Sequence, residues 1–396
     1  MKITKIEIQK LFLPPPMPHR RATEELLIKI HTDEGITGFS ECSGGGLYSG
    51  ETPNAQMAVI KDLFAPVLIG EDPFNVEKIM TMIGPMLGPR SFLMVKGAIE
   101  FALYDIMGKA LKMPCYRLLG GAWSKEIPLT WVLAMPDPKE AAKFAVSALE
   151  AGYKSIKVKV GTAWGSKGPE QDLERCIAVR DAIGKSTPMG IDSNQSLGNV
   201  DGACKLISRI NSKCDIEYAE QPLPSWDIAG LAALRKRLEV PIYADESAFT
   251  LQELLACIKA EAVDGILIKV ERTGYYMGKR IVATADAAGL SVIVGGMSGL
   301  GLQLAQNAHF IASTRKLFEV PWAFGCGTIC QHFFKFSTAD IPKDSDIAVP
   351  TPEIAKGILK VPEGPGLGVE LNEKVVKKYA KEPPEVITEE NVKKLM

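Results

Sequence analysis

Residues 153–161 read YKSIKVKVG and form the pattern of a short buried strand. Side chains alternate between the two faces of a strand, so the apolar residues lie on one face and Lys157 and Lys159 share the other. Two neighbouring ammonium groups repel each other, and burying them is costly unless an anion faces them. The stretch therefore predicts either a solvated edge strand or a strand whose lysines face a negatively charged site.

Strand and helix patterns alternate from residue 126 onward. Eight apolar strand patterns are separated by seven helical patterns, and this number and length fit a parallel (β/α) barrel of the TIM type. A doubly wound open sheet also alternates, but no Gly-x-Gly-x-x-Gly follows its first strand. The strand patterns are IPLTWVLA (127–134), SIKVKV (155–160), MGID (189–192), IEYAEQP (216–222), PIYADES (241–247), GILIKV (265–270), SVIVGG (291–296) and LFEVPW (317–322).

The first part of the chain has a different texture. MKITKIEIQKLFL and the stretch 24–42 alternate apolar and polar residues around a turn signal at 33–35, which predicts a three-stranded antiparallel sheet. Helical patterns follow around 55–68, 74–87 and 93–112. We therefore expect an α+β capping domain over 1–125, the barrel over 126–350, and a C-terminal segment, 351–396, that returns to the capping domain.

Composition narrows the class of protein. The chain has 396 residues, 46% of them hydrophobic, and a formal net charge of −1, which argues against nucleic acid or an anionic membrane as a partner. It lacks a signal-peptide core and any apolar run of the roughly 18 residues that a membrane span needs. The eight scattered cysteines indicate buried thiols of a cytoplasmic protein. Cys326, Cys330 and His332 are spaced loosely like a metal site. A structural zinc site needs four ligands, however, and no matching second pair stands nearby, so we do not expect zinc there.

Charged residues recur at the carboxyl ends of the predicted strands. From Lys159 onward, successive ones lie about one strand–helix unit apart, so each of these belongs to its own strand at the mouth of the barrel, where polar groups are catalytic. One acid after a strand is often a helix N-cap, but six charges in register need another explanation. These residues are Lys157, Lys159, Asp192, Glu220, Asp245 and Lys269.

The three carboxylates form an all-oxygen set suited to a hard cation, Mg²⁺, with positions open for substrate. Lysines flank them on both sides. A neighbouring ammonium and a divalent cation both lower the pKa of a lysine toward neutral pH, where its amine can act as a base. A base opposite a metal-bound carboxylate suits removal of the α-proton, giving an enediolate whose charge the metal stabilises.

Several motifs together resemble those of the muconate-lactonizing-enzyme subgroup of the enolase superfamily. This subgroup belongs to the mandelate racemase/muconate lactonizing enzyme family. The stretch FALYDIMGKALKMPCYRLLGG (101–121) resembles the helix and junction that lead into the barrel of that family, and the resemblance covers nearly the whole chain. The motifs are KVK (157–159), DSNQ (192–195), AEQPL (219–223), ADES (244–247), IKVERTG (268–274) and GLSVIVGGM (289–297).

The resemblance implies a role for each site residue. Asp192, Glu220 and Asp245 would bind Mg²⁺, for which Mn²⁺ could substitute. Lys159 and Lys269 would be the acid/base pair, and Lys157 an auxiliary lysine that tunes Lys159 and contacts the substrate carboxylate. Asn194 and Glu246 match positions beside the metal ligands. The family also implies a small carboxylate substrate and a homo-oligomer.

The chain departs from the family pattern at the last strand. The Asp-x-Asp pair of dipeptide epimerases is replaced by PWAFG (321–325), which weakens a dipeptide assignment, and Tyr275 stands where a second glycine is common. Trp322 and Phe324 either form an aromatic wall suited to a cationic substrate or simply pack. The remaining candidate substrate contacts are Tyr48, Trp131, Met297 and Ser298, together with His19 and Arg20. The loops 14–25, with His19 and Arg20, and 43–50, with Tyr48, resemble the specificity lids of this family.

Three functions are compatible with these residues. A racemase or epimerase of an amino-acid derivative would use both lysines. A muconate-type cycloisomerase or a hydroxy-acid dehydratase would need only one. A non-catalytic ligand-binding barrel would need neither, and the intact set of lysines and acids argues against it.

Overall fold

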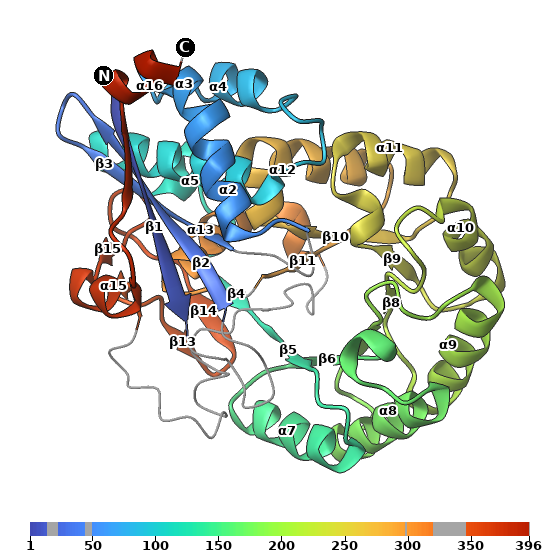
Figure 1. The fold of residues 1–396 in the computed structure, drawn as a ribbon. Coiled ribbons are helices and arrows are strands. Elements are labelled where there is room, and N and C mark those ends of the chain that lie inside the picture. Colours follow the sequence, from blue (N-terminus) through green and yellow to red (C-terminus); the bar gives the residue numbers. More distant parts are fainter. Residues whose placement is uncertain (14–22, 44–49, 298, 320–345, 396) are drawn as a thin grey trace.

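The computed structural model describes residues 1–13, 23–43, 50–297, 299–319 and 346–395. Its elements form a curled parallel sheet ringed by helices and, beside it, a capping domain of β-sheet and helices (Figure 1). Segments near both ends of the chain meet in the capping domain, where Lys5 pairs with Thr388.

The capping domain contains an antiparallel sheet in the order β16-β1-β2-β3. The predicted meander of three strands is present, with Asp33 and Gly35 in the turn between β2 and β3. The fourth strand comes from the other end of the chain, because Lys5 of β1 pairs with Thr388 of β16. The strands are β1 (Ile3–Leu13), β2 (Thr23–Thr32), β3 (Thr37–Ser43) and β16 (Glu385–Thr388).

Helix α5 (Leu93–Ala110) joins the capping domain to the barrel. It is buried on most of its circumference because it packs against β3 on one side and against α12 (Val270–Ala287) on the other. Gly97 permits this approach, since a Cβ there would lie 2.3 Å from the backbone oxygen of Glu271. The other elements on the way to the barrel are α2 (Pro53–Val59), the π-helix η1 (Ile60–Phe64), α3 (Ala65–Leu68), α4 (Val76–Ile83) and α6 (Cys115–Leu118).

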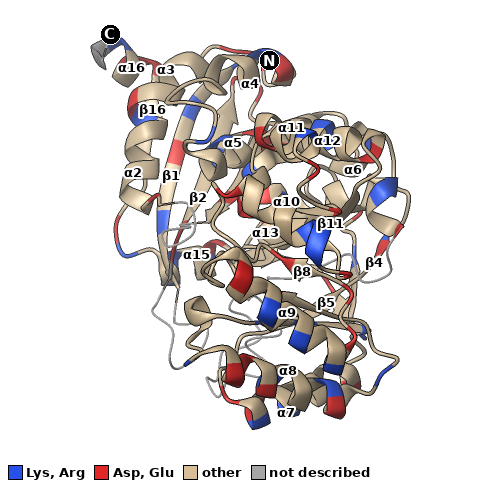
Figure 2. Cartoon of the chain, turned by 90° about the vertical axis from the view of Figure 1, so that its right-hand side faces the viewer, with Lys and Arg blue, Asp and Glu red and all other residues tan. Residues whose placement is uncertain are grey.

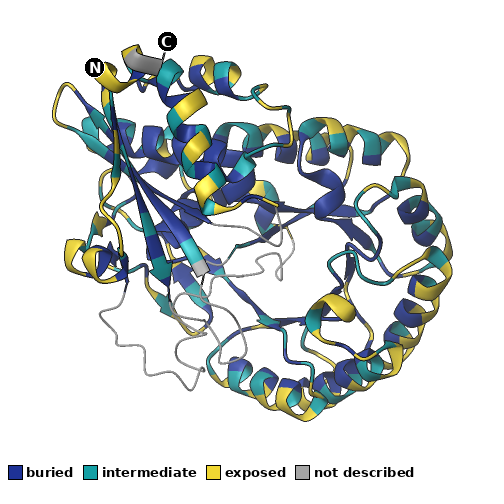
Figure 3. Cartoon of the chain, in the orientation of Figure 1, coloured by how far each residue is buried: buried dark blue, intermediate teal, exposed yellow. Residues whose placement is uncertain are grey.

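The barrel sheet has seven parallel strands in sequential order from β5 to β11. Its strands are buried, and the surrounding helices turn an exposed face outward, as Figure 3 shows. The strands are β5 (Thr130–Leu133), β6 (Ser155–Lys159), β7 (Met189–Asp192), β8 (Ala219–Glu220), β9 (Ile242–Ala244), β10 (Gly265–Lys269) and β11 (Ser291–Gly295). The helices are α7 (Pro138–Glu150), α8 (Pro169–Ile183), α9 (Val200–Cys214), α10 (Ile228–Arg237), α11 (Leu251–Lys259), α12 and α13 (Gly301–Ala312).

Two of the predicted strands differ from the structure. The pattern 127–134 divides into β5 and a separate strand, β4 (Glu126–Pro128), because Pro128 has no N–H to continue a ladder and β4 pairs with β14 (Ile358–Lys360) instead. The first residues of the pattern 317–322 lie in the 3-10 helix η4 (Arg315–Phe318), from which Leu317 is buried in the core. Burial from one helical turn accounts for this apolar pattern, and residues 320–322 lie outside the described chain.

The C-terminal segment adds β12 (Ala348–Val349), β13 (Ile354–Ala355), β15 (Glu370–Leu371), α15 (Glu373–Tyr379) and α16 (Glu389–Leu395). The six described cysteines are free thiols, and all but Cys204 are buried. Within the described residues, no helix combines the length and apolarity that crossing a membrane requires. Basic and acidic residues alternate along α7, α8 and α9, so these helices present no surface of a single charge (Figure 2).

Candidate active site

The strand register brings the predicted charges to one end of the barrel. Lys159 of β6 pairs with Asp192 of β7, and Asp192 pairs with Glu220 of β8. Asp245 directly follows β9, and Lys269 is the last residue of β10. Strands of valine, isoleucine and alanine therefore end in a row of charged side chains at the carboxyl end of the sheet, as the spacing along the sequence predicts.

Carboxylates face the two lysines of β6 and offset the repulsion between their two ammonium groups. Lys157 Nζ donates to Glu220 Oε2 at 2.8 Å and lies 3.6 Å from Asp192 Oδ2. Lys159 Nζ donates to Asp192 Oδ2 and, at 2.6 Å, to Asn194 Oδ1. All of these charged side chains are buried, so β6 is not a solvated edge strand.

The third carboxylate has its own cationic partners. Lys269 Nζ donates to Asp245 Oδ2 at 2.5 Å, and Arg272 Nη2 donates to Asp245 Oδ1 at 2.6 Å. The sequence analysis did not identify Arg272, although it lies three residues after Lys269 within the IKVERTG motif. Lys269 and Arg272 therefore share one anion, the carboxylate of Asp245.

Burial and neighbouring charges shift the pKa values of these groups. Burial raises the pKa of Asp192, but Lys159 and Lys157 outweigh it and bring it to about 2. Burial and the charge of Asp192 raise the pKa of Glu220 to about 8. Burial lowers the pKa of Lys157, but the charges of Glu220 and Asp192 outweigh burial, so the pKa of Lys157 is raised above its ordinary value. Burial, aided by Arg272, lowers the pKa of Lys269, as a base requires.

Asn194 and Glu246 lie beside the three acids, where the sequence placed them. Asn194 has a φ of 40°, a left-handed conformation that asparagine tolerates, and its N–H donates to Asp192 Oδ1 at 2.9 Å. Its Nδ2 donates to Glu246 Oε1 at 3.0 Å. Burial and the charge of Asp245 raise the pKa of Glu246 to about 7.

The acids could hold a cation, although they are engaged in ion pairs. No group of three or more His, Cys, Asp or Glu side chains in the described part of the chain is gathered around a metal position, and each of the three carboxylates is paired with a lysine or with Arg272. Two buried oxygens, Glu220 Oε1 and Glu246 Oε2, have no hydrogen-bond partner among the described residues. An all-oxygen donor set with a buried oxygen to spare fits Mg²⁺.

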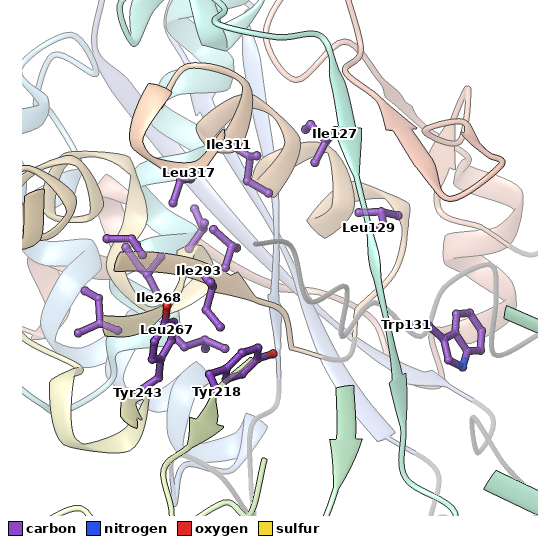
Figure 4. Packing of buried hydrophobic residues seen from close by; sticks show 14 of the residues in the cluster. Ile127, Leu129, Trp131, Tyr218, Tyr243, Leu267, Ile268, Ile293, Ile311 and Leu317 are labelled. Carbon is purple, nitrogen blue, oxygen red and sulfur yellow. The ribbon is translucent and has the colours of Figure 1, made fainter. Parts of the chain in front are cut away.

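Among the predicted substrate contacts, the structure describes only Met297 and Trp131. Met297 lies just beyond β11, half-buried, and its N–H donates to Glu271 Oε1 at 3.0 Å. Trp131 of β5 lies in register with Ile156, whereas Val132 lies in register with Lys157, so Trp131 faces away from the lysines. It is one of the buried core residues drawn in Figure 4, and its ring centroid lies 5.0 Å from that of Tyr153. This position corrects its expected role as a substrate contact. The other candidates lie outside the described residues: His19, Arg20, Tyr48, Ser298, Trp322 and Phe324, together with Cys326, Cys330 and His332.

A tryptophan beside the site was also missed. Trp164 follows β6 in the 3-10 turn η2 (Thr162–Trp164), and its ring centroid lies 4.7 Å from Lys159 Nζ. Its Nε1–H donates to Asn194 Oδ1 at 2.9 Å. The only signal in the sequence is its position, five residues after Lys159, which does not reveal the path of the loop.

The arrangement of the strands agrees with comparisons to known proteins. Residues 140–375 match the family described as enolase C-terminal domain-like, and residues 16–120 match the N-terminal domain of mandelate racemase and muconate lactonizing enzyme. The chain belongs to the mandelate racemase/muconate lactonizing enzyme family. The resemblance proposed from the motifs is confirmed, and so is the fold, a modified TIM barrel with a capping domain.

Relatives in this family cover almost the whole chain. An N-succinyl-L-Arg/Lys racemase of Bacillus cereus is 30% identical over 386 residues, 94% of this chain and 96% of that protein. Muconate cycloisomerase 1-1 of Acinetobacter lwoffii is 27% identical over 390 residues, 96% and 97% of the two chains. The crystal structure of a mandelate racemase/muconate lactonizing family protein from Azoarcus sp. EbN1 is 35% identical, with a TM-score of 0.88 over 98% of this chain and 100% of that one.

These relatives are racemases, epimerases and cycloisomerases, so this chain is an isomerase of the enolase superfamily. That result removes the non-catalytic barrel from the alternatives. Enzymes of the mandelate racemase/muconate lactonizing enzyme family are generally Mg²⁺-dependent and act on small carboxylates.

Proposed function

We propose that this isomerase is a Mg²⁺-dependent racemase or epimerase that moves the proton α to the carboxylate of an amino-acid derivative. One observation carries the proposal. Lys159 ends β6 and Lys269 ends β10, and the three strands between them end in or lead into Asp192, Glu220 and Asp245. In a curled sheet this order puts one lysine on each side of the carboxylates.

Two lysines on opposite sides can reverse the configuration of one carbon. The neutral amine of one lysine takes the α-proton, and the electron pair of the broken C–H bond passes into an enediolate. The ammonium of the other lysine then gives a proton to the opposite face of the same carbon. The lowered pKa of Lys269, caused by burial and by Arg272, suits it to act as the base in one direction.

Asp192, Glu220 and Asp245 would hold Mg²⁺, which would stabilise the negative charge that develops on the substrate carboxylate. Glu220 Oε1 supports this assignment, because it is buried and has no hydrogen-bond partner in the part of the chain that the structure describes. Asn194 and Glu246 would keep the neighbouring groups in place through their mutual hydrogen bond.

The substrate class rests on the relatives and on one departure from them. The Bacillus cereus relative acts on N-succinylated arginine and lysine by its name, and another relative is a hydrophobic dipeptide epimerase. PWAFG (321–325) stands where dipeptide epimerases carry Asp-x-Asp, so N-acyl amino acids are the first candidates. We also place the enzyme in the cytoplasm as a homo-oligomer, and light scattering of the purified protein tests that assembly.

Exchange with solvent deuterium tests the reaction directly. N-succinyl-L-lysine and N-succinyl-D-lysine are incubated separately with the Mg²⁺-loaded enzyme in D₂O, and the α-proton signal is followed by NMR. Both signals should disappear, and excess EDTA should prevent this. Failure of both enantiomers, in this pair and in a panel of N-acyl amino acids and dipeptides, would contradict the racemase proposal.

A muconate-type cycloisomerase is the second candidate because the Acinetobacter relative matches over nearly its full length. It would require only one lysine as acid or base. Mg²⁺-dependent loss of the ultraviolet absorbance of cis,cis-muconate, without exchange of any N-acyl amino acid, would favour it over the racemase.

A further inference from the structure

Trp164 and Lys159 meet on the same oxygen. The indole Nε1–H of Trp164 donates to Asn194 Oδ1 at 2.9 Å, and Lys159 Nζ donates to that oxygen at 2.6 Å. The indole ring also lies against the ammonium, with its centroid 4.7 Å from Nζ, within the range of a cation–π contact. Trp164 is half-buried, so it contacts Lys159 from the loop that follows β6.

Trp164 also decides which way the amide of Asn194 points. Oδ1 faces two donors, and Nδ2 donates to Glu246 Oε1 at 3.0 Å. A reversed amide would place its NH₂ group against the ammonium and the indole N–H, so donors would face donors. The indole N–H therefore favours the one orientation of Asn194 in which Lys159 has an acceptor.

This pair of contacts does not depend on the metal ligands. Lys159 also donates to Asp192, but that carboxylate would turn toward a cation. Asn194 and Trp164 are neutral groups outside the proposed ligand set, so their contacts with Lys159 would persist. We propose that Trp164 is a positioning residue, which holds the amine of Lys159 toward the substrate through its ring and through Asn194. This inference rests on the proposed two-lysine racemase.

The effect should be confined to one side of the site. Lys269 is held by Asp245, which Arg272 also contacts, at the end of β10. Trp164 belongs to the turn after β6, on the Lys159 side of the row of strands. A role in general stability would lower both half-reactions together, whereas positioning of Lys159 lowers one.

The test compares Trp164→Ala, Trp164→Phe and a matched control, Trp226→Ala, in which the lost indole is 80% exposed on the loop after β8. Exchange of the α-proton of N-succinyl-L-lysine and of N-succinyl-D-lysine is measured for each in D₂O. Misplacement of a reacting group by about 1 Å costs on the order of 10²-fold. Trp164→Ala should therefore slow the enantiomer served by Lys159 by about 10- to 10²-fold and leave the other nearly unchanged.

Trp164→Phe keeps an aromatic face but loses the N–H, so its one-sided loss should be smaller, and Trp226→Ala should match the parent. Equal loss for both enantiomers, or no loss for either, would overturn the proposal.

A structural measurement decides the inference even if the parent exchanges neither enantiomer, which would reject the proposed function alone. Crystal structures of the Mg²⁺-loaded parent and Trp164→Ala are compared at Lys159 and Asn194. We expect the variant to lose the contact between Lys159 Nζ and Asn194 Oδ1. An unchanged contact with an unchanged amide would overturn the positioning role of Trp164.

Discussion

Glu100 of the capping-domain helix α5 accepts the backbone N–H of Tyr276 in the barrel helix α12 at 2.5 Å. Helix α12 is interrupted at Gly274, where φ is 62°, and resumes at Tyr275. The carboxyl of Glu100 thus meets the first N–H groups of the resumed helix, six and seven residues after Lys269, where an acceptor is needed. A side chain of the capping domain therefore caps a helix of the barrel.

Stability should fall with rising pH because of Glu100. Burial raises the pKa of this carboxyl to about 8, although the N–H groups of Tyr276 and Tyr275 oppose the shift. Between pH 4.5, the ordinary pKa of a glutamate, and about 8, the folded state keeps a proton that the unfolded state has lost, so the free energy of unfolding decreases as pH rises. The slope contributed by one such proton is about 1.4 kcal/mol per pH unit. Glu100→Gln keeps an acceptor for Tyr276 and should remove this contribution, as urea unfolding at pH 5 to 8 would show.

A surface variant gives the comparison for this series. Glu363 is 60% exposed and pairs with Lys125, so Glu363→Gln should keep the pH slope of the parent. If Glu100→Gln also kept it, Glu100 would be ionised in the folded protein, and the proposed linkage would be wrong.

Gly274 should resist substitution for two separable reasons. Its φ of 62° disfavours other residues, and a Cβ there would lie 2.0 Å from Glu100 Oε2. Gly289 has a similar φ of 73° but nothing within 4 Å of its Cβ position. Gly289→Ala should cost the backbone term, about 1–2 kcal/mol. Gly274→Ala should cost a further ~1–3 kcal/mol in urea unfolding because it overfills a packed site.

Removing the carboxyl should abolish that excess. In a Glu100→Ala background, Gly274→Ala should cost less than it does in the parent, and the remaining cost should come from its backbone, with a φ of 62° and a ψ of −171°. An equal cost of Gly274→Ala in both backgrounds would show that Glu100 moves aside freely.

The charged row at the strand ends was accessible from sequence because it depends only on local spacing. One residue per strand–helix unit fixes Lys159, Asp192 and Glu220 in register, whatever the details of the loops. Trp164 and Glu100 were not accessible in this way. The first depends on the path of a turn, and the second on a contact with Tyr276 that spans 176 residues of the chain.

For Trp131, the sequence pattern did not show which face of its strand the side chain occupies. The pattern 127–134 is apolar on both faces, so alternation alone could not say which residues point toward the lysines. Pro128 ends β4, and only the pairing of Val132 with Lys157 then fixes the facing of β5. The facing of Trp131 therefore depends on the pairing between strands, which the sequence pattern alone does not show.

Asp245→Asn should weaken metal binding. The substitution nearly preserves shape but removes one of the three proposed charges, while Lys269 and Arg272 remain beside it. Even outer-shell changes at metal sites typically cost about 10- to 100-fold in affinity, so loss of a ligand charge should cost at least that in Mg²⁺ calorimetry. Asp264→Asn, which alters a partner of Arg235, is the control and should bind as the parent does. Full activity of the parent in excess EDTA would exclude the metal role altogether.

The two lysines should each serve one enantiomer. Lys159 and Lys269 end strands on either side of the carboxylates, so each reaches one face of a bound α-carbon. Lys159→Ala should abolish α-proton exchange of one enantiomer in D₂O while Lys269 still exchanges the other, and Lys269→Ala should give the mirror result. Loss of a general base typically costs ~10²–10⁴-fold, and both variants should lose net racemisation.

Arginine at the same positions separates base from charge. Lys269→Arg keeps a cation whose pKa is too high for it to act as a base, so a racemase should lose the same enantiomer as with alanine. A cycloisomerase needs one lysine as a base and the other mainly as a charge, so arginine should rescue one position and not the other. Lys167→Ala, in the exposed part of the loop after β6, should leave both rates unchanged. If neither lysine affected either enantiomer, the two-base mechanism would fail, and if only one mattered, the cycloisomerase would replace it.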